Sequence, residues 1–210
     1  MFTGIVQALV EVQHLEARND LTRLTLAMAG HTDNLELGAS VAVNGTCLTV
    51  TEVKDDAVHF DVIVETLRMT NLCKVGVGDL VNMERSFKVG DEIGGHVVSG
   101  HVTGTADVIA KRTAGDDWVL RFGTEQDWLK YVFYKGFIAI DGASLTVSAI
   151  SRDEGWLEVS LIPETRARTT LGYADVGSVV NIEVDAQTVS TVETVERVLK
   201  DRDFLKQLSA

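Results

Sequence analysis

Two short polar pairs in the sequence have the spacing needed to hold a flat ring by its edge. Cys47 and Thr49 lie in the run NGTCLTV, and Ser144 and Thr146 lie in the run DGASLTV. If each run is a strand, side chains two residues apart point to the same face. Thiol and hydroxyl groups placed side by side can hydrogen-bond the donors and acceptors along a ring edge. The alternative for Cys47 is a buried small apolar side chain, the usual environment of a free cysteine.

Further polar groups are expected close to these pairs. Asp61–Thr66 (DVIVET) and Ser160–Thr165 (SLIPET) each end a predicted strand in Glu-Thr, which offers backbone groups and a hydroxyl to a ligand that both donates and accepts. Ser40 precedes the first pair and can orient a water or a ring nitrogen. Lys135 and Asp141 flank the strand before the second pair. Either can complete the site electrostatically, and the alternative for both is a surface ion pair.

These groups recur because the chain repeats itself. The runs NGTCLTV and DGASLTV begin 97 residues apart and share four of seven residues. ETLRMTNL and ETRARTTL begin 99 residues apart and share four of eight, and VGVGDLVNME and ADVGSVVNIE, also 99 apart, share five of ten. Thr3-Gly4 is echoed by Thr103-Gly104. Because the blocks keep the same order in both halves, the sequence predicts two similar domains.

His101 adds a group that can give or take a proton near neutral pH. The repeat is expected to align Met1 with His101 and Phe2 with Val102, so that the two copies differ here. The alternative is a structural histidine satisfied by hydrogen bonds. His96 follows two glycines and is expected in a turn or an interface, and no role is predicted for three further histidines, His14, His31 and His59.

Each copy is predicted to be mostly β, because Val, Ile, Thr and Leu segments alternate with Gly, Asn and Asp. The first copy has predicted strands at Phe2–Glu11, Leu21–Ala27, Ser40–Val43, Cys47–Val53, Val58–Val64 and Leu80–Glu84. The second has them at His101–Ala110, Trp118–Phe122, Phe137–Ile140, Leu145–Ile150, Trp156–Leu161 and Val179–Val184. Six short strands suit a small closed barrel. Short helical turns are expected at Glu65–Asn71 and Glu125–Phe133, and hairpin turns at Asn44-Gly45 and before the second polar pair.

The end of the chain has no counterpart in the first copy. Gln187–Leu208 lacks Gly and Pro and has apolar residues at three- and four-residue spacing, which predicts an amphipathic helix. Its apolar stripe needs a surface, and we expect a contact between subunits. The predicted domains are a first barrel over residues 1–96, a second barrel over residues 97–186 and an oligomerisation helix over residues 187–210.

The composition restricts the classes of function. The chain has 19 Lys and Arg against 31 Asp and Glu, a formal net charge of −12 at pH 7. This charge repels nucleic acid and anionic membranes, so neither is expected as a partner. No apolar run approaches the roughly 20 residues of a membrane span, and no secretory leader is visible at the start. Two cysteines are too few for a disulfide framework and form no close metal-binding cluster with histidines. We therefore expect a cytoplasmic protein without a metal.

Six runs of the sequence resemble the riboflavin synthase family of lumazine-binding-repeat enzymes: MFTGIV, NGTCLTV, ETLRMTNL, EIGGHVVSGHV, YKGFIAIDGASLTV and IPETRARTTLG. The resemblance runs from Met1 to about Leu199, nearly the whole chain. The resemblance implies an all-β fold of two similar six-stranded antiparallel Greek-key barrels, with a C-terminal α-helix that assembles a homotrimer. It implies a dismutation in which two molecules of 6,7-dimethyl-8-ribityllumazine exchange a four-carbon unit. The products are riboflavin and 5-amino-6-(D-ribitylamino)uracil, and no cofactor is implied.

The resemblance also places the active site between the N-terminal barrel of one subunit and the C-terminal barrel of the next. The catalytic residues that it implies are Cys47, His101, Ser40, Thr146 and Phe2. The implied substrate contacts are Gly4, Ile5, Val6, Cys47, Leu48, Thr49, Asp61, Val62, Ile63, Val64, Glu65, Thr66, Gly100, His101, Val102, Lys135, Ser144, Leu145, Thr146, Ser160, Leu161, Ile162, Pro163, Glu164 and Thr165. Ala139, Ala143 and Arg166 depart from the family's usual residues beside the site.

Two other functions remain as alternatives. Lumazine proteins share this fold and hold a lumazine or a flavin without turning it over, and they are degraded in the second copy. A non-enzymatic β-barrel interaction module would need only the fold. Polar ring-binding positions in both copies favour the enzyme, and this chain has them at Cys47 and Thr49 and at Ser144 and Thr146. The resemblance also suggests an association with lumazine synthase.

Overall fold

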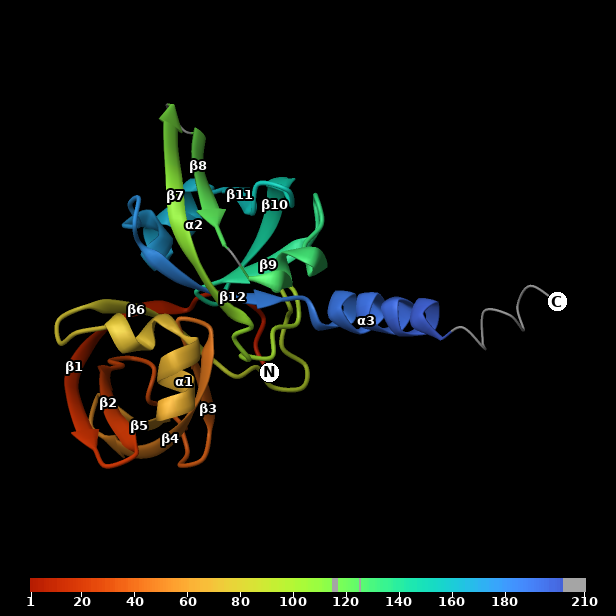
Figure 1. Cartoon of the computed structure of the whole chain (residues 1–210). Coiled ribbons are helices and arrows are strands. Elements are labelled where there is room, and N and C mark those ends of the chain that lie inside the picture. The colour runs from red at the N-terminus through yellow and green to blue at the C-terminus, as the bar shows by residue number, and fades with distance from the viewer. Residues whose placement is uncertain (115–116, 125, 202–210) are drawn as a thin grey trace.

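The computed structural model describes residues 1–114, 117–124 and 126–201, and it contains two closed antiparallel β-barrels of six strands each (Figure 1). The prediction of an all-β fold with two similar barrels and a C-terminal helix is confirmed. The strands of the first barrel are β1 (Ala8–Arg18), β2 (Leu21–Ala27), β3 (Ser40–Val43), β4 (Thr46–Lys54), β5 (Ala57–Ile63) and β6 (Leu80–Arg85). They close in the order β1-β2-β5-β4-β3-β6.

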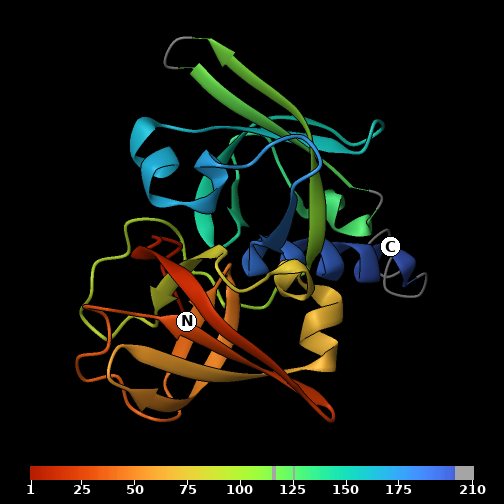
Figure 2. The ribbon, with the colours of Figure 1, turned by 90° about the vertical axis from the view of Figure 1, so that its left-hand side faces the viewer.

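The second barrel has the same strand order, as expected for two copies of a repeat. Its strands are β7 (Gly104–Ala114), β8 (Asp117–Gly123), β9 (Phe137–Ile140), β10 (Ala143–Ser151), β11 (Trp156–Ser160) and β12 (Val179–Val184). Figure 2 shows the barrels one above the other, with the long hairpin of β7 and β8 directed away from the first barrel. Inward-facing residues alternate along the strands, as in β5, where Val58, Phe60 and Val62 are buried.

The first strand of each barrel begins later than predicted. β1 starts at Ala8 and not at Phe2, and β7 starts at Gly104 and not at His101. The reason is the pairing partner. Ala8 pairs with Met83 of the same barrel, whereas Phe2 forms an isolated antiparallel bridge with Val98 in the segment that joins the barrels.

The predicted hairpin turns bring the two barrels into contact. Asn44 and Gly45 have φ angles of 44° and 77°, and Asp141 and Gly142 have φ angles of 46° and 79°. Positive φ at both central residues is the requirement that Asn-Gly and Asp-Gly satisfy. The two turns pack backbone to backbone, because a Cβ added to Gly45 would lie 2.6 Å from the Gly142 nitrogen. Neither position therefore accommodates a side chain.

Short helices follow or precede the strands at equivalent places. These are α1 (Val64–Met69), η1 (Asn71–Lys74), η2 (Asp127–Tyr131), α2 (Pro163–Arg168) and η3 (Thr170–Gly172). α1 and η1 occupy the first predicted helical turn, and η2 occupies the second, whose predicted first residue, Glu125, lies outside the described residues.

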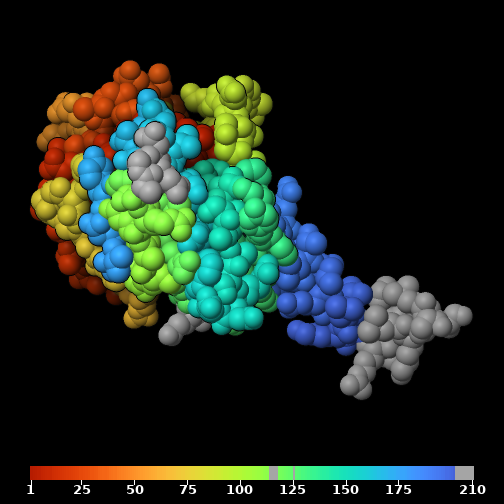
Figure 3. Space-filling view, turned by 90° about the horizontal axis from the view of Figure 1, so that it is seen from above, coloured from red at the N-terminus to blue at the C-terminus, as the bar shows by residue number. Residues whose placement is uncertain are grey.

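The C-terminal helix α3 (Ala186–Lys200) projects from the second barrel (Figures 1 and 3). The Asp185 side chain caps it by accepting from the Thr188 N–H at 2.8 Å. The Lys130 ammonium group of η2 contacts the Glu193 carboxylate at 3.1 Å. Val195 and Leu199 are 52% and 61% exposed, so much of the apolar stripe is uncovered in the single chain. The predicted helix extends to Leu208, and residues 202–208 lie outside the described residues.

The segments before and between the barrels contact both of them. Val6 precedes β1 in the sequence but packs into the core of the second barrel. The predicted boundary between residues 96 and 97 lies in the segment that joins β6 to β7, and its position stays a prediction. Among the described residues, no helix combines the length and the apolar character needed to cross a membrane.

Candidate functional site

The first polar pair lies where two strands of the first barrel separate. β4 pairs with β3 from Thr46 to Thr49, but its ladder with β5 begins only at Val50, opposite Phe60. Among the described strands, none therefore pairs with the second edge of the Cys47–Thr49 segment. The Cys47 N–H instead donates to the Gly100 carbonyl at 2.9 Å. Backbone groups of Asp61–Ile63 border the same opening.

The second barrel repeats this opening. β10 pairs with β9 from Ala143 to Thr146 and with β11 only from Val147 onward. The Ser144 N–H donates to the Gly4 carbonyl at 2.8 Å. We define the first half-site as Cys47–Thr49, Asp61–Thr66 and Gly100–Val102, and the second half-site as Ser144–Thr146, Ser160–Thr165 and Gly4–Val6. Each half-site is thus completed by a segment from the other repeat.

Two buried glutamates hold the completing segments in place. The Glu84 carboxylate accepts from the Thr3 N–H at 2.6 Å, the Thr3 hydroxyl at 2.8 Å and the Gly4 N–H at 3.1 Å. Glu183 accepts from the Ser99 N–H and hydroxyl, both at 2.7 Å, and from the Gly100 N–H at 3.0 Å. Burial raises the pKa of both carboxyls, and these hydrogen bonds oppose the rise. Sequence reasoning missed this pair, although a Glu ends both the VNME and the VNIE blocks.

The two glutamates correct the alignment of the repeat. Gly4 and Gly100 are equivalent, and the Ile5 and His101 N–H groups make the same contact with the Thr3 and Ser99 hydroxyls. Ile5 therefore occupies the position of His101, and the predictions that Met1 aligns with His101 and that Thr3-Gly4 matches Thr103-Gly104 are wrong. The error arose because the offset between the copies is 96 residues here and 97 to 99 in the blocks that revealed the repeat.

His96 contacts the second half-site, which sequence reasoning did not predict. Its Nδ1 lies 2.6 Å from the Ser144 hydroxyl, and its ring stacks on Phe137 with centroids 5.1 Å apart. Burial lowers the pKa of His96, although Asp185 acts in the opposite direction, so the neutral ring is favoured. The only sequence signal was the run GGHVVSGH, in which His96 and His101 both follow a glycine.

Other side chains also distinguish the half-sites. Ser40 lies opposite Thr49, whereas Phe137 lies opposite Thr146 at the equivalent place. The Lys135 N–H donates to the Val147 carbonyl at 2.9 Å, and Lys135 has φ 63°. In the first barrel the same contact is made by Gly38, with φ 83°. Lys135 therefore has a cationic side chain at a position that favours glycine, and its Nζ lies 5.3 Å from the Tyr134 ring centroid.

Phe2 lies between the half-sites and is fully buried, with Ala42, Val98 and Ala139 around it. Its ring also packs on Gly100, where an added Cβ would lie only 2.8 Å from a ring carbon. In the single chain these neighbours cover the Phe2 side chain. The assignment of Phe2 to the catalytic residues stays a prediction.

The remaining predicted residues divide between the surface and the interior. Asp61 is bound to Arg23 at 2.9 Å, and this hydrogen bond lowers the pKa of Asp61. Its carboxylate is thus committed to an ion pair. Exposed positions are Ile5, Thr49, Ile63, Val64, Glu65, His101, Lys135, Thr146, Ser160, Ile162, Pro163 and Glu164. Half-buried positions are Ser40, Cys47, Asp61, Thr66, Val102, Ser144 and Thr165, and buried ones are Gly4, Val6, Leu48, Val62, Gly100, Leu145 and Leu161.

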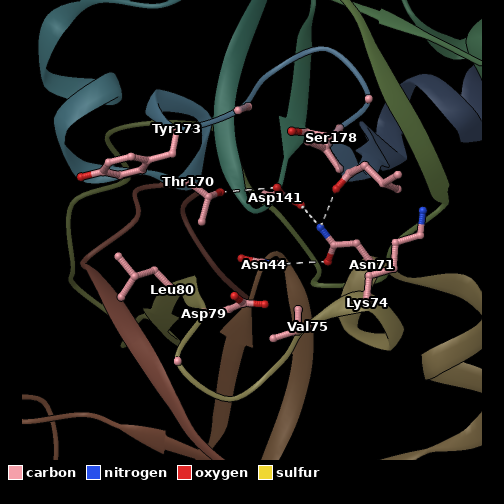
Figure 4. Close-up of a pocket in the computed structure, with 15 residues that line it drawn as sticks. Asn44, Asn71, Lys74, Val75, Asp79, Leu80, Asp141, Thr170, Tyr173 and Ser178 are labelled. Atoms are coloured by element: carbon pink, nitrogen blue, oxygen red, sulfur yellow. Dashed lines mark hydrogen bonds between the residues drawn. The ribbon is translucent and has the colours of Figure 1, made fainter.

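Asp141 belongs to the contact between the barrels and does not complete a half-site. Its side chain accepts from the Asn71 side chain at 2.9 Å (Figure 4). Its Oδ1 also accepts from the Asn181 N–H at 2.8 Å. Burial raises the pKa of Asp141 to about 7, against these hydrogen bonds. A groove of about 620 Å³ runs along this network and contains none of the predicted half-site residues. Among the described residues, no group of three His, Cys, Asp or Glu is placed to hold a metal ion.

Comparisons with known proteins agree with this duplicated arrangement. The model of the lumazine binding domain family matches the chain twice, at residues 3–86 and 99–185. The chain is 48% identical to the riboflavin synthase of Escherichia coli (strain K12) over 205 residues, which cover 97% of this chain and 95% of that protein. It is 44% identical to the riboflavin synthase of Mycobacterium tuberculosis (strain ATCC 25618 / H37Rv), covering 95% of this chain and 98% of that one.

Solved structures of LumP have the same fold. LumP complexed with riboflavin superposes with a TM-score of 0.81 at 26% identity, covering 88% of this chain and 100% of that one. LumP complexed with 6,7-dimethyl-8-(1'-D-ribityl) lumazine gives a TM-score of 0.79 at 25% identity, covering 88% and 99%. With two matches to the family model and relatives of this identity over nearly its whole length, the chain belongs to the riboflavin synthase family.

Proposed function

We propose that this chain forms riboflavin and 5-amino-6-(D-ribitylamino)uracil from two molecules of 6,7-dimethyl-8-ribityllumazine, by transfer of a four-carbon unit from one to the other. The observation that carries the proposal is the presence of two half-sites with the same backbone frame and different side chains. A dismutation needs the same molecule bound twice in two different roles. The names of the relatives support this reaction, and LumP supports a lumazine and a flavin as ligands of this fold.

Each half-site offers one molecule the groups that it needs. The open edge of Cys47–Thr49 and the facing end of β5 supply backbone donors and acceptors for the edge of a pteridine ring. We expect Glu65 and Thr66, at the start of α1, to bind the hydroxyls of the ribityl chain. Ser144–Thr146 and the start of α2 provide the same groups in the second half-site.

The geometry of the joining segments supports a site shared between two chains. Phe2 and Val98 form an antiparallel bridge, so Gly4 and Gly100 lie toward opposite ends of this two-stranded ribbon. Each glycine touches one polar pair, at Ser144 or at Cys47. Two substrates bound to one chain would therefore be separated by the ribbon. Apposing the first half-site of one subunit and the second half-site of another brings the reactants together, and proximity of this kind supplies a large part of the rate.

The side chains at the half-sites match the chemistry. The reaction requires loss of a proton from an activated methyl group and a nucleophile or base nearby. Cys47 and the exposed His101 supply a thiol and an imidazole at the first half-site. At the second, Ser144 is paired with neutral His96, which can take or return a proton through the hydroxyl. Ser40 and Thr146 are additional hydroxyls at the rims.

We also propose a homotrimer that uses α3 as a subunit contact, with lumazine synthase as an associated protein. The exposed apolar residues Val195 and Leu199 support the use of α3, because apolar side chains on a projecting helix are stabilised by burial. A cytoplasmic location agrees with two free cysteines, Cys47 and Cys73.

The test is an anaerobic assay with 6,7-dimethyl-8-ribityllumazine as the only substrate. Riboflavin should appear by fluorescence, with one molecule formed for two consumed, because no oxidant is needed. A second function, non-catalytic binding of a lumazine or flavin, is suggested by the similarity to LumP. Tight binding with an unchanged absorbance spectrum over hours would favour that function and overturn the enzymatic one.

A further inference from the structure

The first barrel contains an apolar cavity outside the half-sites. It has a volume of about 190 Å³ and lies between the barrel wall and the α1–η1 segment. Seven of its nine lining residues are Leu or Val, including Leu15, Leu24 and Leu67. The others are Thr22 and Cys73, and no charged side chain lines it. Val62 is the one lining residue that it shares with the first half-site.

In the second barrel an indole ring lies at the equivalent place. Thr22 pairs with Val62 of β5, and in the same register the Trp118 carbonyl accepts from the Leu161 N–H at 2.8 Å. Trp118 is therefore the counterpart of Thr22. Its ring packs against the core of the second barrel.

The neighbours of this indole ring also differ between the barrels. The Lys111 ammonium lies 4.6 Å from the Trp118 ring centroid, and the Arg166 guanidinium lies 4.0 Å from it. The repeat places Leu15 where the second barrel has Lys111, and Leu67 where it has Arg166. The first barrel thus has neither the ring nor the two cations at these positions, and its walls are apolar.

We propose that this cavity binds a small, uncharged, planar aromatic molecule of about the size of indole. An apolar cavity of about 150 Å³ in another protein stays dry and binds benzene, so this larger cavity has room for one or two fused rings. A charged ligand is disfavoured because none of the lining residues can pair with it. The ribityl-bearing substrate of the proposed reaction carries many hydroxyls and fits neither the size nor the lining.

The second barrel supplies independent support for the shape of the ligand. The same fold, built from the same register, accommodates the indole of Trp118 at the corresponding position. Because Thr22 stands where the second barrel has Trp118, nearly the whole volume of the ring is left unfilled in the first barrel. A free ring therefore restores in the first barrel a contact that the second barrel makes within its own chain.

Methyl NMR of the full-length protein, titrated with indole, tests the proposal. The methyl signals of Leu15, Leu24 and Leu67 should move and saturate, with the protein already saturated with riboflavin so that the half-sites are occupied. Absence of saturable movement up to the solubility limit of indole would overturn the proposal. Movement of these signals that is seen only in the absence of riboflavin would do the same, because the ring would then occupy a half-site.

Variants that fill the cavity provide the control. Thr22→Trp should lower the affinity for indole at least tenfold, because its own ring takes the volume. Gln13→Trp adds an indole on an exposed position of β1 and should leave the binding unchanged. If Thr22→Trp does not fold, Thr22→Phe fills part of the same volume and should also weaken binding. Unchanged binding in the filled variant, or equal loss in Gln13→Trp, would contradict the assignment.

Discussion

Single side chains distinguish two half-sites whose backbones are alike. Cys47 stands against Ser144, His101 against Ile5, and Ser40 against Phe137. The polar pairs could be predicted because alternation along a strand and duplication of the run are both visible in the sequence. The contact of His96 with Ser144 could not, because it joins residues 48 positions apart through the fold alone.

Cys47→Ser tests the thiol of the first half-site. The hydroxyl keeps the size and the hydrogen bonding but is a weaker nucleophile and acid, so we expect kcat to fall at least about tenfold with little change in lumazine affinity. Steady-state kinetics and equilibrium titration measure the two quantities. Thr51→Ser, on the exposed side of the same strand, is the control. Unchanged kcat in Cys47→Ser would remove the thiol from the mechanism.

His96→Gln tests the histidine that sequence reasoning missed. Burial lowers the pKa of His96, so its neutral form persists below the ordinary value of about 6.5. The rate of the wild-type protein should therefore fall on the acid side only at a pH below that value. His96→Gln should lower kcat and abolish this acid limb of the pH–rate profile. His59→Gln, whose ring bonds Thr25 outside the half-sites, should preserve the profile. An unaltered acid limb in His96→Gln would assign it to another group.

Separated strands, together with the paired segments at Phe2 and Val98, build the half-sites. The strands of the sheets could be predicted closely, because alternation fixes which residues face the core. The starts of β1 and β7 could not, because Phe2 and Val98 pair with each other and leave the barrel ladders. The role of Glu84 and Glu183 also depends on the pairing of these segments, because each glutamate holds a segment that is far from it in the sequence and close to it only in the fold.

Gly100→Ala tests the completing segment of the first half-site. An added Cβ would lie 2.6 Å from the Cys47 Cβ, and φ is 83°. We expect lumazine binding at this half-site to weaken at least about tenfold, together with a loss of stability of about 1–3 kcal/mol. Gly90→Ala, at φ 101° with nothing within 4 Å, shares the backbone strain alone. Calorimetric titration and thermal unfolding separate the effects, and equal binding by both variants would contradict the role of Gly100.

Val195→Lys combined with Leu199→Lys tests α3 as a subunit contact. Both side chains are exposed in the single chain, so the substitutions should leave the barrels folded. Buried in an interface, two ammonium groups without partners oppose association. Light scattering after size-exclusion chromatography should show that the proposed trimer is converted to smaller species. Val77→Lys, exposed on the first barrel, is the control. An unchanged mass of the double variant would exclude α3 from the assembly.

For the whole molecule, a buried polar network fixes one barrel against the other. Hydrogen bonds join three residues of the first barrel to three of the second. The first set is Asn44, Asn71 and Asn82, and the second is Asp141, Thr170 and Asn181. The sequence indicated the two turns and their equivalence. It did not indicate that they meet, because an Asn-Gly or Asp-Gly turn is usually exposed, and only the fold packs Gly45 on Gly142.

Asp141→Asn tests this network through the pH dependence of stability. Burial raises the pKa of Asp141 to about 7, above about 3.9 in the unfolded chain. Between these values the folded protein binds more protons than the unfolded chain, so the free energy of unfolding decreases as pH rises, by at most about 1.4 kcal/mol per pH unit. Asn, the residue at the equivalent position 44, removes this titration. As pH rises from 5 to 8, the free energy of unfolding of the variant should therefore increase relative to that of the wild-type protein.

Urea unfolding at pH 5 and pH 8 measures this difference. The exposed Asp107→Asn is the matched control, and its difference from wild type should be equal at the two pH values. A constant difference for Asp141→Asn as well would show that Asp141 does not titrate in this range.

We propose that each active site combines the first half-site of one chain with the second half-site of another. The test mixes two variants, each impaired in one half-site: Cys47→Ser in the first and Ser144→Ala in the second. The two chains are unfolded together, refolded as a mixture and assayed for riboflavin formation. Random mixing joins two intact half-sites in about one case in four, so we predict about a quarter of the wild-type rate, well above either variant refolded alone. A rate no higher than the mean of the two variants, with mixed assemblies demonstrated by mass spectrometry, would contradict the claim.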